Sequence, residues 1–509
     1  MIHLLLLPVL VPLVAAILML ALHRRGPALA RGVGLASMAL VALVAVLLVL
    51  RTEGGAVWTV ALGDWPAPFG IVLVADRLSV TMVAVTAAVA LPALLAACDG
   101  TDLRGRHFHP FFQLQVAGLN GAFLTGDLFN LFVFFEVLLI ASYGLLVHGG
   151  GAARMRAGLH YVVLNLAGST LFLVALALVY GTLGTLNLAD LARRLLLIPA
   201  EDLALVRTAF GLMLVVFVLK AAILPLSFWL PHAYAAASPP VAALFAVMTK
   251  VGLYALLRVL VTGLAASPVT AGLLSPWLTP LAIATVVVAT LGVLAATRLS
   301  TVVANLVLLS TGMLAAALAE GSAALIAAAM YYLPHTTLVT AAFFLLAGHI
   351  AEGRGEVGDQ LTRGPRMPAA PWLGAAYLVL GVAVTGLPPL SGFLGKVMLL
   401  TAAPASMAGY AMWITFILSG FVGALVLARS ASTLFWEPVA ADGPPAPAGP
   451  PLRRNLGLLL ALAFVPMLVL GAGPLSAHAR ATAEQLLARQ PYLDAVLPPD
   501  AEVARERRP

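Results

Sequence analysis

Long apolar stretches alternate with short polar connections from one end of the chain to the other. About 20 consecutive apolar residues are needed for a helix to cross the hydrocarbon core of a bilayer. By this measure we expect about fourteen membrane-spanning helices, at approximately 2–22, 33–50, 71–97, 108–126, 127–147, 158–180, 206–230, 239–262, 276–296, 299–319, 323–349, 370–402, 407–436 and 454–475. The pattern predicts an all-α polytopic membrane protein, and its short loops leave no room for a catalytic domain outside the bilayer.

Two of the predicted helices, the seventh and the twelfth, contain proline close to a lysine. Lys220 precedes Pro225 in the seventh, and Pro389 precedes Lys396 in the twelfth. Proline removes a backbone donor and clashes with the preceding turn, so each helix should bend or break, which a membrane tolerates where the break lines a polar path. Interruptions at corresponding places are typical of transporters built from repeats. We therefore expect two inverted five-helix repeats, helices 4–8 and 9–13, each with one broken helix.

The predicted helices group into four segments: an N-terminal three-helix segment (1–107), a first repeat (108–262), a second repeat (263–436) and a C-terminal segment (437–509). The last segment starts with a proline-rich connector, ADGPPAPAGPP, which cannot be helical throughout. A final helix follows, and the tail after Pro474 is expected to form one short amphipathic helix. The first apolar stretch has no basic region before it and no convincing cleavage site, so we interpret it as a retained helix.

Composition and charge agree with a membrane location. Hydrophobic residues make up 62% of the chain and charged residues 10%, which excludes an ordinary soluble domain. If each loop is numbered by the helix that it follows, fourteen arginines lie in odd loops (24, 25, 31, 104, 106, 154, 156, 298, 354, 363, 366, 429, 453, 454) and six in or beside even loops (51, 77, 193, 194, 207, 258). Cytoplasmic loops carry the excess of basic residues. The net charge of +7 therefore predicts cytoplasmic odd loops and external termini, and does not indicate nucleic-acid binding.

The three lysines of the chain, Lys220, Lys250 and Lys396, all lie inside predicted membrane helices. A lysine at bilayer depth costs about 2.5–3.5 kcal/mol on insertion, so such residues are rare and usually functional. Glu136 lies about nine residues into the fifth helix and is the obvious partner for Lys220. The alternative is a static ion pair that locks two helices together.

His335, in the eleventh predicted helix, is the natural bridge between the two lysine-bearing halves, because imidazole titrates near neutral pH. The alternative is a histidine that is hydrogen-bonded as part of the packing. A buried lysine without a counter-charge favours its neutral form. We therefore hypothesise that separating Glu136 from Lys220 releases a proton, which Lys250, His335 and Lys396 pass on through water. Polar residues that could add contacts or hold water are Asn165, Ser169, Thr170, Asn305, Ser310 and Thr311.

Candidate sites for metals and cofactors are sparse. Cys98 is the sole cysteine, so an intrachain disulfide or a cysteine metal cluster is impossible. We find none of the usual phosphate-binding or metal-ligand motifs and expect no cofactor. Asp127, at the start of the fifth helix, is a candidate for a sodium pathway.

Three stretches resemble the antiporter-like subunits of complex I and of Mrp antiporters: GLNGAFLTGDLFNLFVFFEVLLIASYGLLVHGG (118–150), LKAAILPLSFWLPHAYAAASPPVAALFAVMTKVGLYALLRV (219–259) and GLPPLSGFLGKVMLL (386–400). Within that superfamily, GDLFNLFVFFEVLLIASY is most similar to the D subunit of the multisubunit Mrp sodium/proton antiporter. The complex I subunit of the M type carries glutamate where Lys396 stands, and the L type normally continues into a long lateral helix.

The resemblance implies a functional Glu136–Lys220 pair, Lys250 and His335 in a central hydrophilic axis, and Lys396 as the terminal lysine of the second broken helix. It also implies a multi-pass subunit of a bacterial or archaeal cell membrane, which works with other membrane subunits as a secondary transporter and not as an enzyme. Sodium could bind in a neighbouring subunit or near Asp127 and Glu136. Three alternatives remain: a proton-pumping subunit of a complex I or hydrogenase-type redox enzyme, a solitary solute transporter, and a structural scaffold.

Overall fold

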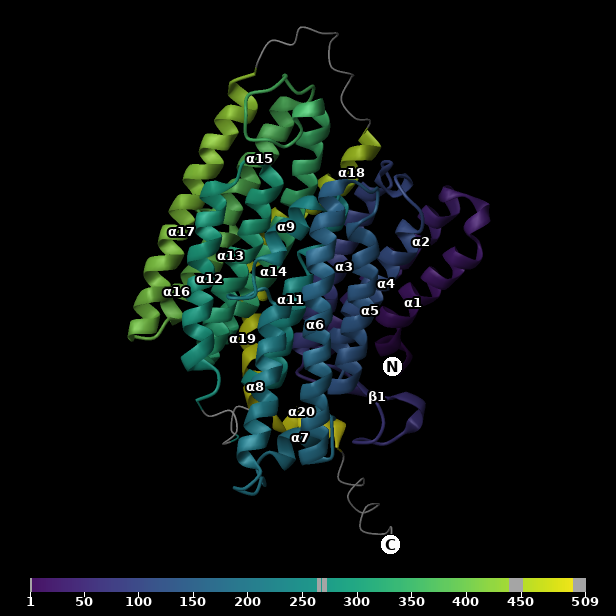
Figure 1. Ribbon diagram of the computed structural model, residues 1–509, viewed down its shortest axis with the longest axis vertical. Helices are drawn as coiled ribbons and strands as arrows, with labels where there is room; N and C mark the ends of the chain where they lie inside the picture. Colours follow the sequence, from purple (N-terminus) through teal and green to yellow (C-terminus); the bar gives the residue numbers. More distant parts are fainter. Residues whose placement is uncertain (1, 263–266, 268–271, 439–451, 498–509) are drawn as a thin grey trace.

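The computed structural model describes residues 2–262, 267, 272–438 and 452–497, and these form a bundle of long helices (Figure 1). The helices are α1 (Ile2–Ala21), α2 (Pro27–Thr52), α3 (Arg77–Ala97), α4 (Phe108–Leu124), α5 (Leu128–Leu146), α6 (Ala152–Leu183), α7 (Leu188–Arg194), α8 (Leu203–Lys220), α9 (Trp229–Ala236), α10 (Pro239–Phe245), α11 (Met248–Ala255), α12 (Ser275–Ala295), α13 (Leu299–Glu320), α14 (Ala323–Gly353), α15 (Ala370–Thr385), α16 (Ser391–Ala402), α17 (Met407–Ala431), α18 (Leu452–Leu470), α19 (Ala472–Ala488) and α20 (Gln490–Val496). A π-helical turn (Leu256–Thr262) extends α11.

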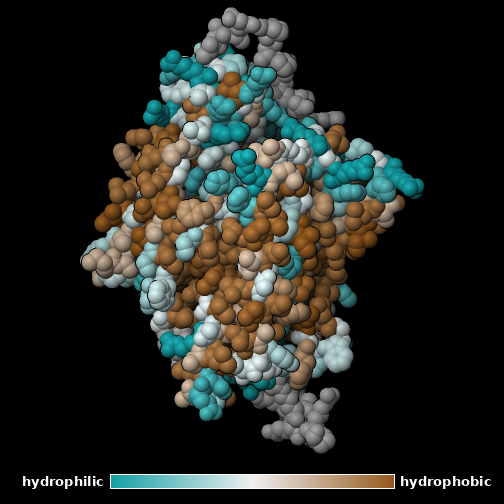
Figure 2. Space-filling view, viewed as in Figure 1, coloured by the Kyte–Doolittle hydropathy of each residue, from teal (hydrophilic) through white to brown (hydrophobic). Residues whose placement is uncertain are grey.

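Among the described residues, eleven helices are long and apolar enough to cross a membrane, or twelve if the bent pair near the C-terminus counts as one span. Figure 2 shows apolar side chains covering the middle of the visible face, with polar side chains gathered towards its two ends. The chain is therefore a nearly all-helical polytopic membrane protein, in agreement with the predicted fold class. The total of fourteen spans, the inversion of the repeats and the four-segment division remain predictions. The proline-rich connector and the charged end of the tail lie outside the described residues.

The two predicted helix breaks are present. The first interrupts the seventh predicted helix between α8, which ends at Lys220, and α9, which begins at Trp229. The second interrupts the twelfth between α15, which ends at Thr385, and α16, which carries Lys396. Each break contains the prolines that cannot continue a hydrogen-bonded helix. Lys220 thus ends the first half of its broken helix, whereas Lys396 lies in the second half of its own.

Two expectations about local structure were wrong. Residues 72–75, assigned to the third predicted span, form strand β2 (Val72–Ala75), which pairs antiparallel with β1 (Trp58–Ala61). Asp76 separates this apolar strand from α3, because its carboxylate accepts from the Ser79 amide and caps the helix there. The tail after Pro474 is also not one helix. The segment α19 begins at Ala472, bends 79° from the helix before it, and is followed by α20.

The loops divide between two opposite ends of the bundle. The odd loops form the arginine-rich face (residues 22–26, 98–107, 147–151, 237–238, 296–298 and 354–369), where ion pairs join Arg31 to Asp102, Arg104 to Glu352, and Arg298 to Asp359. The even loops form the hairpin face (residues 53–76, 125–127, 184–202 and α20), joined by the bridges Leu73–Thr125 and Asp127–Asn187. In Figure 1, α7 and α20 mark the hairpin face at the bottom of the view. Which of these two faces lies in the cytoplasm remains a prediction.

Candidate functional site

The first polar group joins Glu136 on α5, Ser169 on α6 and Lys220 at the end of α8. The Ser169 hydroxyl donates to Glu136 Oε1 and accepts from Lys220 Nζ at 3.4 Å. Lys220 Nζ also lies 3.5 Å from both the backbone oxygen and Oδ1 of Asn165. Among the described residues, no ion pair joins Glu136 directly to Lys220. The predicted partners are therefore neighbours, but a serine hydroxyl connects them.

Helix geometry explains this group. Asn165 and Ser169 are four residues apart on α6, so both face α8 on the same side of the helix. Lys220 is buried and its Nζ lies 5.9 Å from the centre of the Phe135 ring on α5. Glu136 is only half-buried. The lysine therefore lies inside the bundle, and the carboxylate lies nearer its outer surface.

The second group surrounds Lys250 on α11, which is completely buried. Its Nζ lies 3.3 Å from both Thr249 Oγ1 and Ser310 Oγ, the latter on α13. A Cβ on Gly252 would lie 2.4 Å from the Ala221 amide nitrogen, so α11 approaches the end of α8 directly. The ammonium group is thus held by neutral hydroxyls, close to the helix end that carries Lys220.

A small cavity of about 20 Å³ lies between these two lysine-bearing helices. Its lining includes Lys220 and Asn165 on one side, and Met248 and Val251 of α11 on the other. A volume of about 10–15 Å³ on this scale holds one water molecule, provided that polar groups contact it. The cavity therefore has room for about one water between the first and second groups.

The third group lies at the second helix break. His335 Nδ1 on α14 lies 2.8 Å from Ser391 Oγ, and Lys396 Nζ donates to the Thr385 backbone oxygen at 2.7 Å. That carbonyl is at the end of α15, where the helix leaves it without an intrahelical partner. A Cβ on Gly392 would lie 2.8 Å from His335 Nε2 and 1.9 Å from the Ala383 backbone oxygen. The histidine therefore touches the broken helix.

The three groups follow one another along a row of packed helices. In this row α5 packs on α6, α6 on α8, α8 on α11, α11 on α13, α13 on α14, and α14 on α16. No hydrogen bond between described residues joins Lys220 to Lys250, or Lys250 to His335. Proton transfer between groups along this row would therefore need intervening water.

Asp127 is buried and lies apart from the lysines, at the hairpin face. Its Oδ1 accepts from the Asn130 amide at 2.8 Å and caps α5. Capping accounts for an acid at this position. Its candidacy for a cation pathway remains a prediction.

Sequence reasoning missed a buried ion pair near the hairpin face. Arg258, which the sequence places beside an even loop, lies in the π-helical turn after α11, and its two terminal nitrogens contact the Asp76 oxygens at 2.5 and 2.7 Å. Both side chains are buried. A signal was present, because Lys250, Tyr254 and Arg258 are spaced four residues apart and share one helix face.

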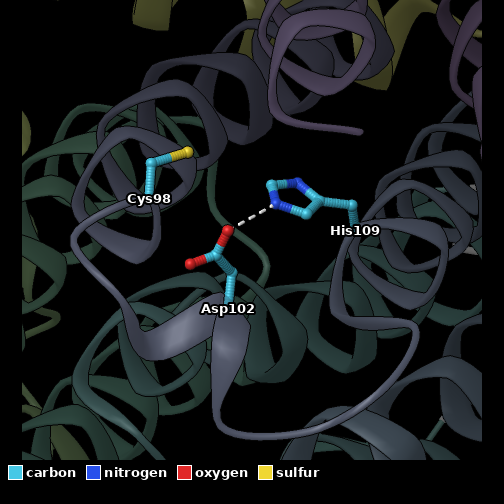
Figure 3. A group of neighbouring side chains, drawn as sticks. All are labelled: Cys98, Asp102 and His109. Carbon is cyan, nitrogen blue, oxygen red and sulfur yellow. Dashed lines mark hydrogen bonds and ion pairs between the residues drawn. The ribbon is translucent and has the colours of Figure 1, made fainter. Parts of the chain in front are cut away.

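A group with metal-binding residue types lies at the arginine-rich face. Figure 3 shows His109 directed at Asp102, with Cys98 alongside. Both Asp102 oxygens already have partners: Oδ2 lies 2.7 Å from Arg31 Nε and 3.0 Å from His109 Nε2, and Oδ1 lies 2.8 Å from Arg31 Nη2. Burial opposes the charged form, but the hydrogen bonds from Arg31 and His109 lower the pKa of Asp102 to about 2. Burial raises the pKa of the Cys98 thiol to about 11.

These properties fit a polar anchor better than a metal centre. A metal-binding cysteine is deprotonated, and this thiol is neutral near pH 7. A cation at Asp102 would also displace the Arg31 guanidinium. The group therefore ties the start of α2 and α4 to the loop between α3 and α4.

The chain is similar in sequence to known membrane antiporter subunits. Residues 125–423 match the family model described as "NADH:quinone oxidoreductase/Mrp antiporter, TM". A Rhizobium meliloti (strain 1021) protein, named as the probable D subunit of a K(+)/H(+) antiporter, is 39% identical over 97% of both chains. A protein of Alkalihalophilus pseudofirmus, named as the D subunit of a Na(+)/H(+) antiporter, is 36% identical over 79% of this chain and 80% of its own.

Solved structures agree on the fold. A chain of the Mrp complex from Dietzia sp. DQ12-45-1b superposes with a TM-score of 0.84 at 27% identity, covering 97% of this chain and 99% of its own. A chain of the membrane-bound sulfane sulfur reductase, an archaeal respiratory membrane complex, superposes with a TM-score of 0.87 at 25% identity, covering 98% and 100%. The chain thus belongs to the NADH:quinone oxidoreductase/Mrp antiporter family of membrane subunits, and within it to the D subunits of Mrp-type antiporters.

Proposed function

We propose that this chain is the proton-translocating subunit of a multisubunit monovalent cation/proton antiporter driven by the proton-motive force. The observation that carries the proposal is the Glu136–Ser169–Lys220 bridge inside a membrane bundle. An ionisable pair at this depth is costly, and a hydroxyl between the two charges allows them to separate and rejoin by small side-chain movements. The remaining basic groups lie along the row of helices that starts at this bridge.

The proposed cycle follows from the counter-charge of Lys220. With Glu136 close, the ammonium form of Lys220 is stabilised by an opposite charge. When Glu136 moves away, Lys220 keeps only neutral oxygens from Asn165 and Ser169, and it releases its proton. Water in the cavity beside Lys220 carries the proton towards Lys250. His335 and Lys396 continue the path, and return of Glu136 reloads Lys220.

The position of Glu136 near the outer surface is consistent with a partner subunit that packs against α5. On α5, Phe129, Val133 and Ile140 are 47%, 39% and 61% exposed, and helical spacing places them on the same side as Glu136. A carboxylate facing lipid would be strongly disfavoured. We therefore infer that a neighbouring membrane subunit covers this stripe of α5 in the assembled complex. Movement of that neighbour is then a means of shifting Glu136 relative to Lys220.

Orientation in the membrane follows from the two loop faces. The arginine-rich face holds the excess of basic residues, which favours the cytoplasm. The N-terminal end of α1 and the C-terminal α20 would then both lie outside the cell.

The transported cation is proposed as sodium, with potassium as the direct competitor. The relative from Alkalihalophilus pseudofirmus is named for sodium and the one from Rhizobium meliloti for potassium. The proposed proton path uses the same side chains whichever of the two ions is exchanged. Sodium would bind in a neighbouring subunit or near Asp127 and Glu136.

A second candidate function is proton pumping within a redox-driven complex. The likeness to a chain of the archaeal sulfane sulfur reductase favours it, because the same fold serves in a respiratory complex. The neighbouring genes separate the two candidates. Genes for small Mrp-type subunits support the antiporter, and genes for quinone- or cluster-binding subunits support the redox complex.

The direct test uses everted membrane vesicles from an antiporter-deficient host that expresses the whole operon. Sodium or potassium is added to respiring vesicles, and collapse of the pH gradient is followed. We expect cation-dependent collapse with the wild-type chain and none with Lys220→Ala or Glu136→Gln, at equal amounts of assembled complex. Near-normal exchange in either variant refutes the proposed path. No response to either cation from the assembled wild type favours the redox candidate.

A further inference from the structure

A buried cluster at the hairpin face continues the helix face that carries Lys250. Tyr254 is four residues after Lys250 and Arg258 eight residues after it, so the three side chains leave the helix on one side, one turn apart. Arg258 Nε donates to the Tyr254 hydroxyl at 3.2 Å, and that hydroxyl donates to the Phe123 backbone oxygen at 2.7 Å. Hydrogen-bonded polar groups therefore run from Tyr254, one turn beyond Lys250, to the hairpin face, and no hydrogen bond between described residues joins Tyr254 to Lys250.

The Asp76–Arg258 pair lies at the outer end of these polar groups. It is bidentate, with contacts of 2.5 and 2.7 Å, and both side chains are more than nine-tenths buried. A buried ion pair is weak evidence for stability, because desolvation of the charges offsets much of their attraction. The π-helical turn that carries Arg258 is also a rare geometry, which occurs frequently at functional sites. Both features indicate a role beyond packing.

The C-terminal segment covers this pair. The Arg258 guanidinium carbon lies 5.4 Å from the ring centre of Tyr254 and 5.4 Å from that of Tyr492, which belongs to α20. The Tyr492 hydroxyl is buried and has no hydrogen-bond partner among the described residues. It would lie 3.3 Å from a Cβ on Gly126, at the loop before α5. The ring of Tyr492 thus closes the outer side of the guanidinium.

A cavity of about 40 Å³ lies beside Tyr492. Asp76, Arg258 and Tyr492 line it, together with Gln485 and Arg489 of the C-terminal segment. This volume holds roughly two to four waters. Water can therefore approach the ion pair from the hairpin face, and the pair and Tyr492 separate that water from Tyr254.

We propose that the Asp76–Arg258 pair, covered by Tyr492, is a gate that controls access of water-borne protons from the hairpin face to Lys250. The proposal rests on the proposed function of Lys250 in a proton path. When closed, the bidentate pair and the tyrosine ring keep the water of that cavity from reaching Tyr254. Displacement of Tyr492 lets that water pass the guanidinium, and a continuous hydrogen-bonded chain of water then reaches Tyr254 and Lys250.

The attachments of the C-terminal segment suit it to hold such a cover. The Thr59 hydroxyl of β1 donates to the Ala495 backbone oxygen at 3.1 Å, and the Arg77 amide donates to Gln485 Oε1 at 3.0 Å. Val496 packs in a small apolar cluster with Val72, Val74 and Ala189. These contacts hold α20 against the hairpin face, and Tyr492 itself also packs against the large core of the bundle.

The test measures passive proton conductance in liposomes that contain the purified assembled complex and a trapped pH-sensitive dye. No sodium or potassium is present, and a permeant anion balances charge. We expect Tyr492→Ala to raise the leak several-fold over the wild type, and Tyr492→Ala with Lys250→Ala to return it to the wild-type level. The matched control is Tyr180→Ala, on α6, because Tyr180 is 60% exposed and contacts no part of the gate. An unchanged leak in assembled Tyr492→Ala overturns the gate, as does a leak that persists without Lys250.

A second variant covers the case in which Tyr492→Ala does not accumulate. Arg258→Lys keeps the charge but cannot form the two-pronged contact with Asp76. We expect the assembled Arg258→Lys complex to conduct protons passively above the wild-type level, again only when Lys250 is present. An Arg258→Lys complex with the wild-type proton conductance overturns the proposal. Cation-driven exchange by the wild type is measured in the same liposomes. Its absence refutes the proposed function, whereas exchange without a gated leak refutes only the gate.

Discussion

Ser169 offers a direct test of the bridge between Glu136 and Lys220. Ser169→Ala removes only the hydroxyl, which donates to Glu136 and accepts from Lys220 at 3.4 Å. A hydrogen bond to a charged group contributes about 1.5–3 kcal/mol, and each 1.4 kcal/mol corresponds to about tenfold in an equilibrium. If exchange depends on recharging Lys220 through this bridge, its rate should fall roughly 10- to 150-fold by this arithmetic.

The assay is cation-dependent collapse of the pH gradient in everted vesicles, normalised to the amount of assembled complex. Thr170→Ala is the matched control, because Thr170 is the next residue of α6, is exposed, and donates only to the backbone oxygen of Leu166 at 3.1 Å. The control should keep wild-type exchange. Exchange within about twofold of wild type in assembled Ser169→Ala lies well below the loss expected for such a hydrogen bond and would refute the bridge.

Two further variants test the helix packing beside Lys220 and the polar anchor at Asp102. Gly252→Ala should lower exchange severely, because its Cβ would lie 2.4 Å from the Ala221 amide nitrogen and force the two lysine-bearing helices apart. The control is Gly211→Ala on α8, which should match wild type because a Cβ there would have no atom within 4 Å. Asp102→Asn should lower the stability of the complex by about 2–3 kcal/mol in thermal unfolding at pH 7, because its partners hold the pKa of Asp102 at about 2. This contribution is present above about pH 4 and is lost as the pH falls through 2, so equal stability at pH 7 would contradict it.

Much of the fold was predictable because it depends on local properties. Apolar stretches of sufficient length specify helices in a bilayer, where backbone groups must be satisfied within the segment. The prolines near Lys220 and Lys396 locate the two breaks by removing backbone donors. The β1–β2 hairpin was missed because the apolar residues of β2 lie directly before the apolar residues of α3 in the sequence. In the structure, Asp76 caps α3 and separates the strand from the helix.

The buried ionisable residues were predictable from the sequence, and their contacts were less so. Lys220, Lys250, His335 and Lys396 were identifiable because ionisable side chains are rare within apolar helices. Their partners were not, since Ser169 is one of many hydroxyls in the sequence and only the meeting of α5, α6 and α8 places it between the two charges.

The sequence by itself thus determined the membrane class, the helix breaks and the buried ionisable groups, all of which follow from composition and backbone chemistry within single segments. Tertiary structure alone decided that Glu136 and Lys220 meet through a hydroxyl, that His335 contacts the second break, and that Asp76 pairs with Arg258 across 182 positions of sequence. These contacts depend on which faces of distant helices pack together. That choice is made by the shapes of many side chains at once, and no single segment encodes it.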